Sequence, residues 1–169
     1  RIDGIYELIG QGDPDLTYTS IMSLFDAELN RNSFSKNIEI HLYEENKRNW
    51  WPESWALVDR NSPYGPPITR LAVSSNSQST ESFDPVGLLQ EVISNNSAIK
   101  ERNVSQYLYP GEFNEIFPRR FLVSQIKSAP LYALISLANS ESHNFTAEIL
   151  LRVASDSWDS EVATSSLLS

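Results

Sequence analysis

The chain contains no cysteine among its 169 residues, so neither disulfides nor thiolate metal sites can hold it together. Its stability must come from the burial of apolar side chains, which make up 40% of the residues. A chain of this length buries roughly two-thirds of the surface that its unfolded form exposes, which is enough for one core. We therefore expect a single domain over residues 1–169. Because the chain begins with Arg1 and not methionine, we expect this domain to be excised from a larger chain.

Acidic residues outnumber basic residues by 22 to 13, which gives a formal net charge of −9. Binding to nucleic acid and to anionic lipid depends on clustered lysine and arginine, so this balance excludes nucleic acid as an expected partner. The sequence also has no uninterrupted apolar run near the roughly 20 residues that a membrane-spanning helix needs. We therefore expect no transmembrane segment.

Several segments show the patterns of β-strands. Over Lys36–Tyr43, apolar Ile38, Ile40 and Leu42 alternate with polar residues, which predicts a strand with one face on a core. The last third of the chain is rich in β-branched, aromatic and aliphatic residues, which predicts strands. A short link joins Leu131–Ala138 to Phe145–Ala154, so these two segments predict an antiparallel hairpin. The expected strands are Lys36–Tyr43, Ile68–Val73, Arg120–Lys127, Leu131–Ala138 and Phe145–Ala154.

One segment carries clear helix signals. Asp84 is a suitable N-cap, Pro85 a suitable first helical residue, and the apolar spacing that follows predicts a helix ending before Asn95. A poorer helical pattern covers Ala98–Leu108, and the pattern of Thr17–Leu29 fits either a helix or a strand.

These patterns together predict a β-dominated α+β fold, in which a mostly antiparallel, twisted sheet is packed by one or two helices. A β-sandwich or jelly roll is the alternative, if the helix at Pro85 lies at an end of the sheet. The serine-rich segment 74–82 predicts a mobile loop, and residues 155–169 predict a polar tail. The expected core residues are Ile38, Ile40, Leu42, Leu89, Ile93, Phe121, Val123, Leu131, Ile135, Ile149 and Leu151.

The sequence offers little equipment for catalysis. It has only two histidines, His41 and His143, and neither lies in a pattern typical of a metal site or a catalytic triad. The glycines at positions 10 and 12 lack the lysine and the following helix of a phosphate-binding loop. We therefore predict no catalytic residue, no metal site and no cofactor. The alternative is a hydrolase that uses His41 as a base, with Glu44 or Asp59 to orient it.

The most unusual local feature is a cluster of aromatic residues flanked by prolines. Rigid aromatic rings lose little entropy on binding and are enriched at interface hot spots and sugar-stacking sites. This favours a recognition surface, whereas burial of Trp51 and Trp55 in the core is the alternative. We expect Trp50 to be the most accessible of the three tryptophans. The predicted binding residues are Trp50, Trp51, Trp55 and Tyr64.

The layout of Pro130–Val153, followed by Ala154-Ser155-Asp156-Ser157-Trp158, resembles the closing strands of capsid proteins from picorna-like viruses. The size of the domain and its lack of cysteine are similar to the protruding domains that iflavirus-type insect viruses carry on a capsid protein. Such protruding domains have an Asp-His-Ser constellation with adjacent His and Ser, but here His41 precedes Leu42 and His143 precedes Asn144. The resemblance therefore implies a projection on the virion surface, and because of this departure no hydrolytic site is carried over from the family.

The function expected from these observations is a non-enzymatic surface, assembly or recognition domain, such as a capsid projection involved in host attachment. Long polar loops on a stable scaffold are where recognition normally resides. The expected partner is a protein or a glycan at a surface, with assembly among copies of a larger parent protein. A carbohydrate-binding module is a further alternative.

Overall fold

The computed structural model describes residues 5–29, 37–62, 65–76, 84–94, 101–111 and 122–169. The chain divides into two compact units, each made of several stretches of sequence. The expectation of one domain over residues 1–169 stays a prediction. Unit 1 comprises Arg1–Ile9, Thr17–Glu44 and Asp84–Ile126, and unit 2 comprises Gly10–Leu16, Glu45–Phe83 and Lys127–Ser169.

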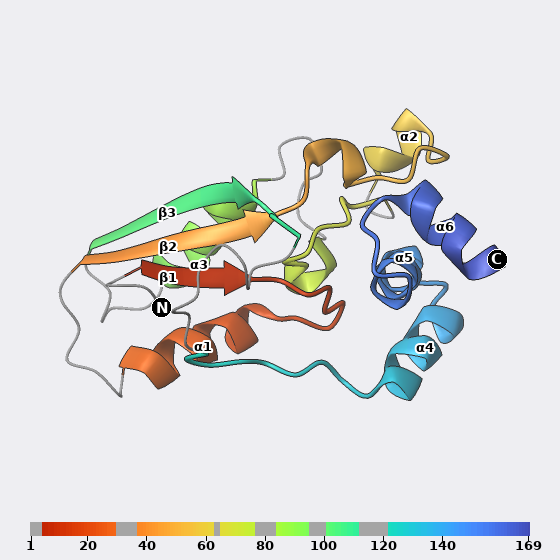
Figure 1. Cartoon of the computed structure of the whole chain (residues 1–169). Helices are drawn as coiled ribbons and strands as arrows, with labels where there is room; N and C mark the ends of the chain where they lie inside the picture. The colour runs from red at the N-terminus through yellow and green to blue at the C-terminus, as the bar shows by residue number, and fades with distance from the viewer. Residues whose placement is uncertain (1–4, 30–36, 63–64, 77–83, 95–100, 112–121) are drawn as a thin grey trace. The chain divides into compact units, whose positions relative to one another are not determined.

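Unit 1 contains a three-stranded sheet whose strands all run parallel. The strands are β1 (Ile5–Ile9), β2 (Asn37–Glu44) and β3 (Glu101–Leu108), in the order β1-β2-β3 (Figure 1). The expectation of a β-dominated, mostly antiparallel sheet is therefore wrong, and so is the sandwich alternative. A helix lies between β1 and β2 in the chain, and a crossover of this kind returns the next strand in the same direction.

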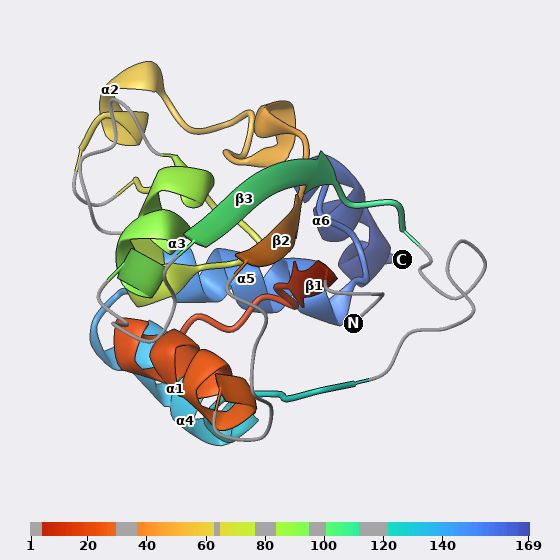
Figure 2. The same cartoon turned by 90° about the vertical axis from the view of Figure 1, so that its left-hand side faces the viewer.

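Two helices of unit 1, α1 (Tyr18–Leu29) and α3 (Pro85–Ser94), lie on one side of this sheet (Figure 2). The structure confirms the helix predicted at Pro85. The Asp84 carboxylate accepts the backbone N–H of Val86 at 3.0 Å, and the Asp84 carbonyl accepts the N–H of Leu88 at 2.9 Å, so Asp84 begins the helix as expected. The ambiguous segment from Thr17 is helical.

The other two predictions for unit 1 have opposite outcomes. The strand predicted at Lys36–Tyr43 is confirmed as β2, in which Ile40 and Leu42 are fully buried. The helix predicted over Ala98–Leu108 is wrong, since this segment contains β3. Only one apolar residue of β3, Val104, is buried, so the strand owes its conformation to its hydrogen-bond ladder with β2 more than to its own pattern.

Unit 2 is built from helices and irregular segments around its own core. That core contains Ile68, Ala72, Phe145, Ile149 and Trp158, with Trp55 packed against it. The elements are the short helices η1 (Lys47–Asn49), α2 (Leu57–Arg60) and η2 (Val73–Asn76), and the longer helices α4 (Leu131–Ser140), α5 (Asn144–Ala154) and α6 (Ser160–Leu168).

The hairpin predicted at Leu131–Ala138 and Phe145–Ala154 is wrong, because these segments form α4 and α5. In α5 the buried apolar residues are Phe145 and Ile149, four residues apart, which is the helical spacing. Glu148 and Arg152 form an ion pair at the same spacing. The alternation that predicted a strand is incidental, since Val153 is exposed.

The two remaining strand predictions are also wrong over the described residues. Ile68–Val73 is buried but irregular, and its backbone bonds to other segments. The N–H of Ile68 donates to the Trp50 carbonyl at 2.6 Å, and the Arg70 carbonyl accepts the N–H of Gly12 at 3.2 Å. Residues 122–127 form no regular element, and the start of the strand predicted at Arg120–Lys127 lies outside the described residues.

The predicted core residues are buried in β2 and α3, the two segments whose secondary structure was predicted correctly, and at Ile149 of α5. Segment 155–169, the expected polar tail, contains α6 and a buried Trp158. In segment 74–82, residues 74–76 belong to η2 and the rest lies outside the described residues. Among the predicted core residues, Ile40, Leu42, Leu89, Ile93 and Ile149 are buried, Val123 and Leu151 half-buried and Leu131 and Ile135 exposed, while the side chains of Ile38 and Phe121 lie outside the described residues.

None of the helices in the described residues combines the length and the apolar character that crossing a membrane requires.

Candidate functional site

The aromatic cluster does not present its rings as expected. The expectation that Trp50 is accessible is wrong, since it is only 1% exposed and is one of the largest fully buried side chains. Its indole N–H donates to the Glu45 carbonyl at 3.1 Å, so burial leaves this donor satisfied. Trp55 is half-buried and packs against the core of unit 2, as the alternative interpretation held. Tyr64 lies outside the described residues.

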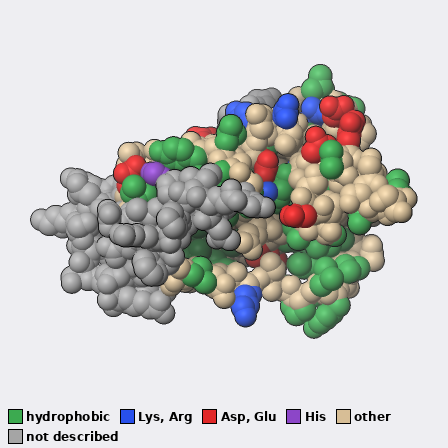
Figure 3. All heavy atoms as spheres, viewed as in Figure 1, with side chains coloured by type: hydrophobic (Ala, Val, Ile, Leu, Met, Phe, Trp, Pro, Cys, Tyr) green, Lys and Arg blue, Asp and Glu red, His purple; other side chains and the backbone are tan. Residues whose placement is uncertain are grey.

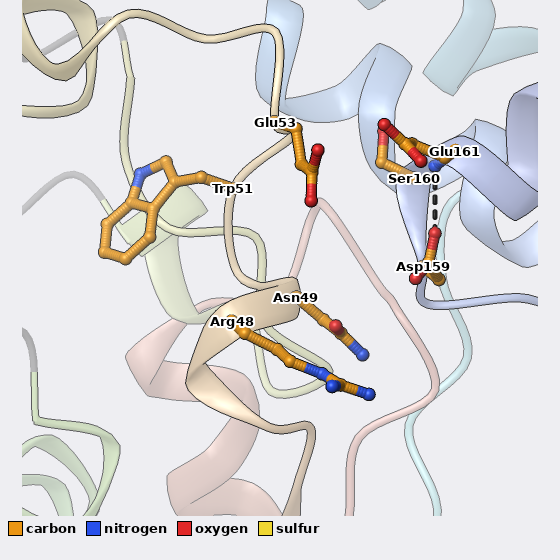
Figure 4. Close-up of a pocket in the computed structure, with 7 residues that line it drawn as sticks. All are labelled: Arg48, Asn49, Trp51, Glu53, Asp159, Ser160 and Glu161. Atoms are coloured by element: carbon orange, nitrogen blue, oxygen red, sulfur yellow. Dashed lines mark hydrogen bonds between the residues drawn. The ribbon is translucent and has the colours of Figure 1, made fainter.

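Trp51 is also half-buried and, unlike Trp55, lines a pocket. Its indole N–H donates to the Gly65 carbonyl at 2.9 Å, and its ring centroid lies 6.2 Å from that of Trp50 at a tilted angle. These two contacts hold the ring in one orientation. Trp51 is therefore a lining residue of fixed orientation, and in Figure 4 its ring extends away from the other lining residues.

The pocket lies within unit 2 and has a volume of about 200 Å³. Two segments that are far apart in the sequence form its walls, one around η1 and one at the beginning of α6 (Figure 4). In the space-filling view of Figure 3, acidic side chains gather near α2 and α6, with basic side chains beside them. The lining residues are Arg48, Asn49, Trp51, Glu53, Asp159, Ser160 and Glu161.

Local hydrogen bonds fix both walls. The Asn46 side chain accepts the N–H of Arg48 at 3.1 Å and caps η1. The Asp159 carboxylate accepts the backbone N–H groups of Glu161 at 3.0 Å and Val162 at 3.1 Å, which caps α6. An N-cap carboxylate of this kind also suits the positive end of the helix dipole. The polar lining of the pocket is therefore set by short-range capping.

The Glu53 and Glu161 side chains face each other across the pocket (Figure 4). The negative charge of Glu53 raises the pKa of Glu161 above that of an ordinary glutamate. Asp159 adds a smaller repulsion of the same sign. The raised pKa of Glu161 is therefore caused chiefly by repulsion from Glu53.

A buried arginine lies behind the η1 wall. Arg152 of α5 is fully buried, and its Nη1 donates to the carbonyl of Asn49 at 2.5 Å. Its Nε donates to the Glu148 carboxylate at 3.0 Å. Burial lowers the pKa of this guanidinium, while Glu148, Glu45 and Asp159 act to raise it. Arg152 therefore ties α5 to the wall of the pocket that carries Asn49.

His41 has a carboxylate partner, but not one of those expected for the hydrolase alternative. Its Nε2 lies 2.8 Å from the Oε1 of Glu39, on the same face of β2. Glu44 is fully buried, and Asp59 belongs to unit 2. Within the described residues, His41 hydrogen-bonds to no serine hydroxyl. The geometry of this histidine therefore adds no nucleophile to the hydrolase interpretation.

The α6 wall of the pocket was not anticipated from the sequence. Asp159 followed by Ser160 and Glu161 is typical of a helix beginning, and this signal could have predicted α6. No sequence signal places these residues near Trp51, because the contact depends on how α5 and α6 pack in unit 2. In the described ranges, no group of three or more histidine, aspartate or glutamate side chains is arranged to hold a metal ion.

The sequence matches no family model, no curated protein and no solved structure.

One consequence of the pocket geometry can be tested by titration. Replacing Glu53 with glutamine removes the charge that repels the ionised Glu161 carboxylate. We expect the pKa of Glu161 to fall toward the ordinary glutamate value. NMR observation of the glutamate side-chain carboxyl carbons against pH measures this. An unchanged Glu161 titration in Glu53→Gln would contradict the proximity of the two groups.

Proposed function

We propose that the protein is a non-enzymatic recognition domain that binds a neutral glycan in the pocket beside Trp51. The supporting observation is that one small cavity is lined by a half-buried tryptophan of fixed orientation together with polar side chains from two segments. Sugar-binding sites use this combination, because the apolar face of a sugar ring stacks on an aromatic ring while its hydroxyls form hydrogen bonds.

The donors and acceptors of the lining suit neighbouring sugar hydroxyls. Arg48 donates, Glu53 accepts, and Asn49 does both. Glu161 adds a further carboxyl group, and Ser160 adds a hydroxyl. A volume of about 200 Å³ limits the occupant to a small group, such as one residue of a glycan chain.

The charge of the lining selects among glycans. Three carboxyl groups line the pocket, against the single positive charge of Arg48. Sialylated or sulfated sugars would bring a further negative charge into this field and be repelled. We therefore propose neutral glycans as the ligands.

An attachment role on a virion surface is a further part of the proposal. A capsid projection that carried this pocket would use it to bind glycans on a host surface. The resemblance to capsid proteins was based on two expected closing strands, and these segments form the helices α4 and α5. The support for glycan binding therefore comes from the pocket and not from the resemblance.

Glycan-array screening followed by calorimetry tests the proposal. We expect binding to a neutral glycan and a loss of roughly tenfold or more in affinity for Trp51→Ala, because a stacked aromatic ring contributes about 1.4 kcal/mol or more at such sites. Tyr132→Ala is the matched control, since Tyr132 is an exposed aromatic residue of unit 2 outside the pocket. Absence of glycan binding, or an equal loss in both variants, would refute the proposal.

A further inference from the structure

A second surface lies on unit 1, on the side of the sheet opposite α1 and α3 (Figure 2). The strand register brings polar and aromatic side chains together there, because alternate residues of each strand share a face. Buried Ile40, Leu42 and Val104 belong to the other face, while on this face Tyr43 is buried and the His41 side chain is half-buried. The described side chains of this face are Ile5, Glu7, Ile9, Glu39, His41, Tyr43, Asn103, Ser105 and Tyr107.

The rings of this face form a contiguous platform. The Tyr107 ring centroid lies 4.5 Å from that of His41 and 5.8 Å from that of Tyr43. The Tyr43 hydroxyl donates to Glu7 Oε1 at 3.0 Å, and His41 Nε2 lies 2.8 Å from Glu39 Oε1. These contacts hold the rings and the carboxylates in place before any partner arrives, which reduces the entropy lost on binding.

Two groups of the platform remain accessible. The Glu39 side chain is 44% exposed and Tyr107 is 42% exposed. Within the described residues, Glu39 uses only Oε1 in its contact with His41, which leaves Oε2 for a partner. The described side chains of this face include two glutamates, Glu7 and Glu39, and no lysine or arginine.

We propose that this sheet face binds an arginine-bearing segment of a partner protein. A guanidinium is planar, so it can lie over the Tyr107 ring while it donates to the Glu39 carboxylate. The negative charge of the face, within a chain of net charge −9, also steers a basic segment toward it. This site goes beyond the proposed glycan pocket, since it uses residues of unit 1 only.

Fluorescence anisotropy with a labelled hexa-arginine peptide tests this proposal at low salt, with hexacitrulline as the uncharged probe of the same shape. We expect hexa-arginine to bind more tightly than hexacitrulline. Tyr107→Ala and Glu39→Gln should each weaken binding roughly threefold to fivefold, as expected for an exposed cation–π contact and an exposed ion pair. Tyr107→Phe should bind as the wild type does, because it keeps the ring.

Glu91→Gln is the charge-matched control, since Glu91 is an exposed residue of α3 away from this face. Gln106→Ala is a second control, on the opposite face of β3. Both should leave the affinity unchanged. Equal binding of hexa-arginine and hexacitrulline, or an equal loss in Glu91→Gln and Glu39→Gln, would overturn the proposal. Loss of the glycan pocket would leave these results unaffected, so the two proposals fail independently.

Discussion

Replacing Trp50 with alanine is expected to destabilise unit 2 by about 4 kcal/mol, in the range measured for truncation of buried aromatic residues. Trp50 is almost fully buried, its indole N–H bonds to the Glu45 carbonyl, and its own carbonyl accepts the Ile68 N–H. The variant loses the ring contacts and leaves the Glu45 carbonyl without this donor. A free energy of this size is a large fraction of the 5–15 kcal/mol that typically stabilises a domain.

Urea unfolding followed by fluorescence and by hydrogen exchange measures this effect. Trp50→Phe is the intermediate variant, which keeps an aromatic ring and loses the indole donor, so we expect a smaller loss. A loss below about 1 kcal/mol in Trp50→Ala, as for most surface substitutions, would contradict the burial of this side chain.

Replacing Arg152 with alanine has the second largest expected effect, a loss of about 3 kcal/mol. Removing one member of a buried ion pair leaves the other charge uncompensated in a poorly hydrated place. Here Glu148 loses its partner and the Asn49 carbonyl loses its donor. Because Asn49 lines the pocket, we also expect Arg152→Ala to weaken the binding of any pocket ligand.

Arg152→Met, combined with Glu148→Gln, separates the charge from the volume. An apolar chain of similar length restores packing and leaves no buried charge, and such replacements are often nearly neutral. Within the described residues the Nη2 of Arg152 has no hydrogen-bond partner, so the guanidinium is not ideally satisfied. Thermal unfolding should therefore rank the double variant above Arg152→Ala. The reverse ranking would show that the charge itself stabilises the unit.

The sequence predicted the elements whose local signals agree with their environment. The helix at Pro85 has its cap, its first-turn proline and its apolar stripe within ten residues, so no distant contact was needed to identify it. The strand β2 alternates because one of its faces is buried. In both α3 and β2, the spacing of the apolar residues matches the repeat of the helix or strand that forms.

The wrong secondary-structure predictions arise where the same residues fit both the two-residue repeat of a strand and the 3.6-residue repeat of a helix. In Leu131–Ala138, leucine and isoleucine alternate with smaller residues, but leucine and alanine also favour helices. The ion pair between Glu148 and Arg152 was the available helical signal in Phe145–Ala154, and counting only apolar residues missed it. The strand β3 carries little pattern of its own, so its identity depends on pairing with β2.

The candidate site was predicted only in part. The aromatic cluster predicted Trp51 as a binding residue, whereas Glu53 was not among the predicted site residues. The roles of the tryptophans were not predictable, because the 1% exposure of Trp50 depends on its contacts with segments such as Ile68. The α6 wall, with Asp159 and Glu161, reaches the pocket only through tertiary packing.

The most direct test of the central claim is a titration of the folded protein with the tightest neutral glycan, followed by NMR of the four tryptophan indole N–H signals. Trp51 lines the pocket, whereas Trp50 and Trp158 are buried in unit 2. We predict a saturable shift that is largest for the indole signal of Trp51 and absent from Trp51→Phe spectra at that position. A saturating glycan that leaves the Trp51 signal in place while it shifts signals elsewhere would contradict the account.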